Sequence, residues 1–170
     1  MKITIDGISE LQERIEGRKN RLKSKSGVFL ERLSTLGAYR ARLDFSAAMY
    51  AGHNDVQLSV EREGDAYLVV ANGNAVAFIE FGTGILNPEH PWSADLGFSH
   101  GTYGAGKGAN PNGWVYVGEQ GNAGQPVGGK RNVYRTYGNP PARAMYNASK
   151  DMRESILAIA KEVFGGGQND

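Results

Sequence analysis

Apolar residues near the start of the chain recur with the spacing of a helix. A short alternating stretch, Lys2–Asp6, predicts a strand, and Ser9–Gln12 then has the form of a capping box that begins a helix. Gly27 interrupts the stripe that follows, so the pattern predicts two helices, or one helix broken near that glycine. The segment is predicted to end at Gly52, the position of a C-cap. The stripe comprises Ile8, Leu11, Ile15, Leu22, Phe29, Leu33, Leu36, Leu43 and Ala47.

A change of period follows and predicts strands. Alternation over 56–61, a turn at Gly64–Asp65 and a returning apolar run at 67–70 together predict an antiparallel hairpin. The next apolar segment, Val76–Phe81, is short, and its periodicity favours neither helix nor strand.

The C-terminal part of the chain again has helical spacing. Asn139 followed by Pro140 has the form of an N-cap and a first helical residue. Apolar residues across 145–163 predict a helix that ends at Gly165, followed by a flexible tail, 165–170. The predicted fold class is therefore α+β: N-terminal helices and a C-terminal helix packed on a small antiparallel sheet, in a single domain spanning 1–170.

Glycine is concentrated in the middle of the chain. Of the 24 glycines, 13 lie between Gly82 and Gly129, among prolines and both tryptophans. Within this region, 114–117 and 133–137 alternate in the manner of strands and are predicted to pair as a second hairpin. We interpret 85–137 as a variable extended loop, or arm. Because glycine-rich backbone loses much entropy on folding, the arm is expected to become ordered through contact with other subunits.

The residue types that carry most enzyme chemistry are scarce. The chain has no cysteine and three histidines, which excludes disulfides, thiolate nucleophiles and cysteine-based metal sites. Gly101–Lys107 has the spacing of a phosphate-binding loop, but Gly108 stands where the magnesium-binding Ser or Thr belongs. The sequence therefore predicts a protein that is not an enzyme and has neither cofactor nor metal. We find no signal peptide and no stretch long enough to cross a bilayer, so no membrane partner is expected.

Positive charge is concentrated near the N-terminus, although the formal net charge is only +1. From Arg14 to Arg42, nine Lys and Arg residues stand against two Glu residues, a local charge of +7. Three interpretations are open: a solvated helix face, non-specific contact with phosphates, or docking on an acidic neighbouring subunit. The residues expected to contact DNA or a subunit are Arg14, Arg18, Lys19, Arg21, Lys23 and Lys25.

Two short motifs resemble those of a viral structural family. The segment Val76–Gly84, which contains Glu80-Phe81-Gly82-Thr83, resembles a motif of neck, or head-to-tail joining, proteins of long-tailed double-stranded DNA phages. These are also described as tail-component or tail-completion proteins. Pro140–Arg143 is similar to the start of the family's Pro-x-Arg-Pro-Phe sequence, with Ala144-Met145 in place of Pro-Phe. The order of elements also fits the family over nearly the full chain.

The resemblance implies a non-enzymatic virion protein, made in the host cytoplasm, that assembles as a ring in the neck between head and tail. Its implied partners are further copies of itself, the head-completion or connector protein and tail proteins, with DNA in the channel lumen as another. The alternative is a non-specific nucleic-acid-binding module that uses the basic N-terminal helices.

A structural junction is expected where these motifs lie. Gly82 is expected to adopt a positive φ, and Glu80 to accept hydrogen bonds from loop amides or from Arg143. The tryptophans are expected to lie exposed in the arm, where subunit contact would use them. The residues predicted at the junction or at an assembly interface are Glu80, Phe81, Gly82, Thr83, Trp92, Trp114 and Arg143.

Overall fold

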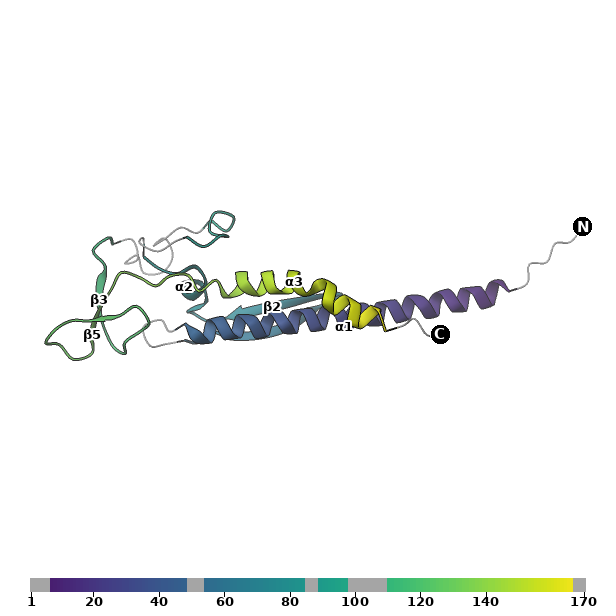
Figure 1. Ribbon diagram of the computed structural model, residues 1–170, viewed down its shortest axis with the longest axis horizontal. Helices are drawn as coiled ribbons and strands as arrows, with labels where there is room; N and C mark the ends of the chain where they lie inside the picture. Colours follow the sequence, from purple (N-terminus) through teal and green to yellow (C-terminus); the bar gives the residue numbers. More distant parts are fainter. Residues whose placement is uncertain (1–6, 49–53, 85–88, 98–109, 167–170) are drawn as a thin grey trace, which may run out of the picture.

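The computed structural model describes residues 7–48, 54–84, 89–97 and 110–166 (Figure 1). In this part of the chain, three helices and five strands form an elongated molecule built along one long helix. The predicted α+β class is confirmed: the long N-terminal helix and the C-terminal helix lie against a small antiparallel hairpin, and a second small antiparallel sheet lies at one end (Figure 1).

Helix α1 (Ile8–Ala47) is continuous, so the prediction of two helices or of a break near Gly27 was wrong. A glycine inside a helix costs only about 1 kcal/mol relative to alanine, too little to break a helix rich in Leu, Lys, Arg and Glu. At about 1.5 Å per residue, the 40 residues span roughly 60 Å.

The ends of α1 are satisfied differently from the sequence prediction. Gly7, in the left-handed region with φ 92°, is the N-cap, and Ser9 lies inside the helix, so the capping box is not formed. At the other end, the side-chain amide of Asn54 donates to the carbonyl oxygens of Phe45 at 2.6 Å and Ala48 at 2.9 Å. These bonds satisfy carbonyl groups that the end of a helix leaves without partners.

Strands β1 (Gln57–Glu63) and β2 (Ala66–Asn72) form the predicted hairpin, with Gly64 at φ 60° in its two-residue turn. One face of the hairpin packs on α1, where Val69 lies against Gly37. Successive side chains of a strand alternate between its two faces, so the neighbours of Val69 along β2, and the residues paired with them on β1, point away from α1. We call this the outer face; its residues are Ser59, Glu61, Glu63, Ala66, Leu68 and Val70.

The segment of undecided periodicity is a short helix, α2 (Val76–Phe81). Asp55 caps its start: one carboxylate oxygen accepts from the backbone N–H of Asn74 at 2.7 Å, the other from that of Ala75 at 2.9 Å. These backbone bonds, that from Asn74 first, hold the pKa of Asp55 below its ordinary value.

Helix α3 (Ala144–Phe164) is confirmed over the predicted stretch, but its predicted start was wrong. Asn139 and Pro140 precede the helix, and Arg143, in the left-handed region with φ 57°, is the N-cap. The core lies where α1, α2 and α3 meet. Small residues let α1 and α3 approach closely there; the buried cluster is Ala41, Phe45, Ile79, Ala144 and Ala148.

The second sheet contains β3 (Trp114–Val117), β4 (Gln125–Pro126) and β5 (Val133–Thr136), in the order β3-β5-β4. Strands β3 and β5 are antiparallel, as predicted. The sheet lies beyond the C-terminal end of α1, to which Asn122 is joined by a hydrogen bond from its side-chain amide to the carbonyl oxygen of Ala47 at 3.2 Å.

The predicted helix end at Gly52 was wrong: α1 ends at Ala47, and Ala48 is extended with φ −93° and ψ 121°. Three other sequence predictions lie outside the described residues: the strand at 2–6, the glycine-rich loop at 101–107 and the last four residues of the tail. Of the helices that the structure describes, none combines the length and the apolar character needed to span a membrane.

Candidate assembly junction

The carboxylate of Glu80 lies buried between two helices, with 4% of its side chain exposed. It comes from the end of α2 but caps the start of α3. Oε2 accepts from the backbone N–H of Met145 at 2.8 Å, and Oε1 from that of Tyr146 at 3.1 Å. A negative charge is stabilised at this position because free N–H groups and the positive end of the helix dipole point toward it. The expected acceptor role of Glu80 is confirmed, and its donors are amides of α3.

His90 completes the surroundings of this carboxylate. Its Nδ1 accepts from the backbone N–H of Trp92 at 3.0 Å, and its Nε2 lies 2.9 Å from Glu80 Oε1. An acceptor at Nδ1 leaves the proton on Nε2, so a neutral imidazole donates to an ionised carboxylate. Burial lowers the pKa of His90 below its ordinary 6.5, although the charge of Glu80 opposes this effect.

The two motifs that suggested a viral structural family bind each other directly. The backbone N–H of Thr83 donates to the carbonyl oxygen of Asn139 at 2.8 Å, and Thr83 Oγ1 accepts from the backbone N–H of Asn139 at 3.0 Å. One turn earlier, the N–H groups of Ala142 and Arg143 donate to the carbonyl oxygens of Ile79 and Glu80, respectively. Residues 79–83 and 139–143 therefore form one hydrogen-bonded unit, which we call the junction.

Gly82 has a conformation that the junction requires. Its φ of 73° confirms the expected positive value. A Cβ at this position would lie 2.6 Å from Pro141 N and 2.7 Å from the carbonyl oxygen of Asn139. Both atoms belong to backbone, so the contact has no side chain that can move aside.

Arg143 lies at the junction as expected, but its guanidinium donates to the carbonyl oxygen of Glu89 at 3.2 Å rather than to the Glu80 carboxylate. Phe81 is buried and meets the His90 ring edge-on at 4.6 Å between centroids.

The expectation of exposed tryptophans was wrong for both residues, which are half-buried. Trp92 packs against two rings beside the junction, 5.6 Å from His90 and 5.3 Å from Tyr146 between centroids. Trp114 lies opposite Thr136 in the second sheet and lines a small cavity together with Asn139. Aromatic rings are large apolar surfaces, and here the chain covers part of them itself.

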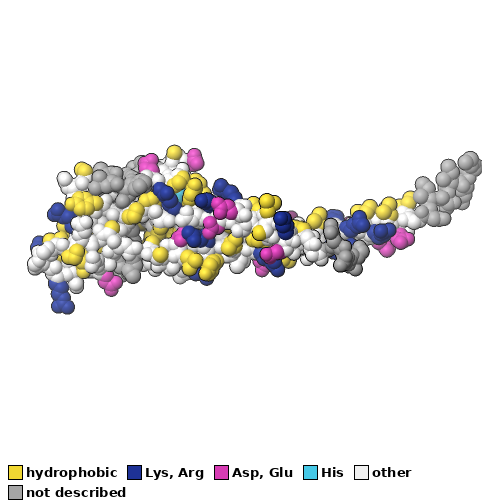
Figure 2. Space-filling view, viewed as in Figure 1, with side chains coloured by type: hydrophobic (Ala, Val, Ile, Leu, Met, Phe, Trp, Pro, Cys, Tyr) yellow, Lys and Arg dark blue, Asp and Glu magenta, His cyan; other side chains and the backbone are white. Residues whose placement is uncertain are grey.

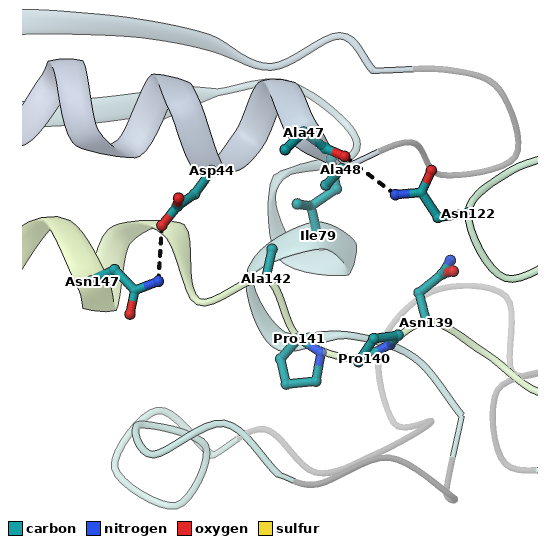
Figure 3. Close-up of a pocket in the computed structure, with 10 residues that line it drawn as sticks. All are labelled: Asp44, Ala47, Ala48, Ile79, Asn122, Asn139, Pro140, Pro141, Ala142 and Asn147. Carbon is teal, nitrogen blue, oxygen red and sulfur yellow. Dashed lines mark hydrogen bonds between the residues drawn. The ribbon is translucent and has the colours of Figure 1, made fainter.

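A cavity of about 310 Å³ borders the junction where α1 ends and α3 begins (Figure 3). Proline and alanine side chains form much of its wall, and asparagine amides reach it from three segments. Asp44 is the one titratable side chain among the described residues that line it, and its carboxylate accepts from Asn147 at 2.8 Å. The same carboxylate lies 3.4 Å from Arg40 Nε, so its charge is paired. No three His, Asp or Glu side chains of the described residues are placed to hold a metal ion.

The basic residues singled out in the sequence lie far from the junction. Residues 8–24 of α1 are exposed on all sides, and much of this segment extends beyond α3 and the hairpin (Figure 1). We call it the projecting segment. Its apolar stripe is uncovered: Ile8, Leu11, Ile15 and Leu22 are each about half exposed, at 49% to 59%. Figure 2 shows hydrophobic and basic side chains next to one another along it.

Comparison with protein-family models, curated proteins and solved structures gives no match to this chain.

Sequence reasoning thus predicted Glu80, Gly82, Thr83 and Arg143 at one place, but it missed His90 and Tyr146. His90 follows a Pro-Glu pair in a loop, and no periodic pattern indicates that it folds back on Glu80. A buried carboxylate such as that of Glu80 needs hydrogen-bond donors around it. This need is the one signal that points to a nearby histidine.

Proposed function

We propose that this protein is a structural virion component of the phage neck, which joins the head connector to the tail as one subunit of a ring. The proposal begins with the resemblance of the motifs at 76–84 and 140–143 to those of head-to-tail joining proteins. The direct contact between these motifs supports it, because two short matches that are distant in sequence form one hydrogen-bonded unit.

The observation that carries the proposal is the balance of buried and exposed apolar surface. Among the described residues, four of the eight buried apolar side chains are alanine, whereas many large apolar side chains are exposed on α1, α3 and both sheets. Exposed apolar surface of this extent is typical of a subunit that completes its packing against neighbours. A ring subunit has two such contact surfaces, one for the neighbour on each side.

In this proposal the junction has a structural role. The Glu80 carboxylate and the backbone bonds between 79–83 and 139–143 fix α2 to the start of α3, and the chain leaves toward the second sheet from this fixed point. A rigid junction sets the angle between the helical body and the second sheet, which determines whether a ring closes.

The proposal is tested in a phage whose copy of this gene carries a nonsense codon. In a non-suppressing host we expect separate, DNA-filled heads and finished tails in electron micrographs. Supplying the protein from a plasmid should restore joined particles, and supplying Glu80→Ala should not. Joined particles in the absence of the protein would contradict a neck function.

The second candidate is non-specific binding of nucleic acid, favoured by the exposed cations of the projecting segment. Lys19 illustrates their exposure: 70% of its side chain is accessible, and its ion pair with Glu16 at 3.2 Å is on the surface. Affinity for DNA should then fall steeply between 50 and 200 mM salt, with a slope set by the number of phosphates contacted. Self-association through apolar surface should change much less over the same range.

A further inference from the structure

The projecting segment has two adjacent rows of side chains. Each residue turns a helix by about 100°, so residues three or four apart share a side. The apolar row consists of Ile8, Leu11, Ile15 and Leu22. Arg14, Arg18 and Arg21 form a second row beside it, at spacings of four and three.

The acidic residues of the segment lie farther from the apolar row than Arg14, Arg18 and Lys19 do. Glu10, Glu13 and Glu16 fall about 110° to 170° away from the centre of the apolar row. The apolar row is therefore bordered by cations and not by acids. A partner surface that matches it has an apolar row beside a row of carboxylates.

The outer face of the β1–β2 hairpin has this arrangement. Glu61 and Glu63 stand in a row on β1, and both are exposed. Directly opposite on β2, Ala66 pairs with Glu63 and Leu68 pairs with Glu61, and Val70 continues the apolar row. Leu68 is 41% exposed, although it lies in the middle of a strand.

We propose that the projecting segment of one copy packs along the outer face of the β1–β2 hairpin of a second copy. This inference rests on the proposed ring assembly. Ile15 and its row would cover Leu68 and Val70, while the arginine row lies over Glu61 and Glu63. The lengths agree: 17 helical residues span about 25 Å, and seven-residue strands span about 24 Å.

The charge pattern favours this occupant over a pair of projecting segments. Two such segments packed side by side bring the arginine row of each copy close to that of the other, and like charges at such a contact are unfavourable. A helix on the hairpin instead makes a heterologous contact, in which each copy uses a different surface toward each neighbour. Contacts of this kind close into rings when the rotation allows.

The hairpin would then lie between two helices, its own α1 on one face and the neighbour's α1 on the other. A two-stranded hairpin is weakly stable alone, and cover on both faces stabilises it. This arrangement explains why a strand with exposed Leu68 is retained at the surface of the single chain.

Two charge reversals test the contact. The helix variant carries Arg14→Glu, Arg18→Glu and Arg21→Glu, and the hairpin variant carries Glu61→Lys and Glu63→Lys. All five residues are exposed, so each variant should keep the circular dichroism spectrum and melting temperature of the wild type. A third protein carries all five reversals. The readout is mass by light scattering over a concentration series.

Wild type is expected to assemble, and each single variant to need at least about tenfold more protein for the same mass. Mixing the two variants in equal amounts should also restore assembly, because the intact surfaces of the two variants match each other and so do their reversed surfaces. The five-reversal protein should assemble like wild type.

If the wild type assembles and either variant assembles equally well, the contact is wrong and the ring proposal stands. Loss of assembly in the helix variant alone also overturns the contact and points to another acidic partner surface. A wild type that stays monomeric contradicts both the contact and the ring.

Discussion

Glu80 and Met145, 65 residues apart, are joined by a 2.8 Å hydrogen bond from the backbone N–H of Met145 to the carboxylate of Glu80. Helix α3 has no side-chain cap from the residues just before it, so a residue of α2 supplies one. Packing of α2, in the first half of the chain, is therefore coupled to the start of the last helix. Asp55 acts in the same way toward α2.

Replacing Glu80 with alanine should lower the free energy of unfolding by about 3 kcal/mol or more. Two backbone N–H groups and the His90 ring then lose their acceptor in a buried site. Glu89→Ala is the matched control, because Glu89 is exposed and contributes its backbone carbonyl to Arg143. Urea denaturation measures both, and equal stability of the two variants would show that the cap is unimportant.

Gly82→Ala should destabilise the protein by more than the roughly 1 kcal/mol of a positive φ alone, because its Cβ meets backbone of Asn139 and Pro141. Gly97→Ala separates the two effects. Gly97 also has a positive φ, 69°, but a Cβ there meets nothing within 4 Å. In thermal unfolding, the melting temperature of Gly82→Ala should lie well below that of Gly97→Ala. Similar melting temperatures would mean that the backbone of the junction shifts to accommodate the added Cβ at little cost in free energy.

Stability should fall as pH decreases below about 6.5. The buried imidazole of His90, which faces Glu80 and Arg143, has a pKa below 6.5 in the folded protein. Well above pH 6.5 it is neutral in both the folded and the unfolded state, and pH has no effect through this group. At lower pH the unfolded chain binds a proton that the folded protein resists, which favours unfolding.

Urea denaturation at pH 7.5 and 5.5 measures this effect in wild type and in His90→Gln. Glutamine can still donate to Glu80 but does not titrate in this range. The His90→Gln variant should therefore lose less stability between pH 7.5 and 5.5 than the wild type does. His53 and His100 are present in both proteins and cancel in the comparison. An equal loss in both proteins would assign the pH dependence to other groups.

The periodic elements were predictable from the sequence because their signals are local. Alternation at 56–61, 114–117 and 133–137 indicated strands, and the helix at 145–163 has a clear apolar stripe. The start of α1 was mispredicted because Gly7, in the left-handed region, is the N-cap in place of Ser9. The start of α3 was mispredicted because a distant residue caps it: Asn139 has a suitable side chain, but Glu80 accepts from the free amides of α3 in the folded chain. His90 could not be placed from the sequence for the same reason.

Gly27→Ala should raise the free energy of unfolding by about 0.5 to 1 kcal/mol, because α1 is continuous there and a Cβ meets nothing within 4 Å. Gly37→Ala in the same helix should raise the free energy of unfolding by less than Gly27→Ala does, or should lower it, since its Cβ meets the Met152 side chain. Chemical denaturation compares the two. A loss of stability in Gly27→Ala would indicate that the helix bends at this glycine in solution.

The central claim, that the chain is a subunit of a closed ring, is tested most directly by the mass of the purified protein. Light scattering after size exclusion, with negative-stain images of the same fractions, gives mass and shape together. We expect one species at a whole-number multiple of the 18.3 kDa chain mass, appearing as rings and largely preserved between 50 and 500 mM salt. A species of 18.3 kDa at every protein and salt concentration would contradict the claim.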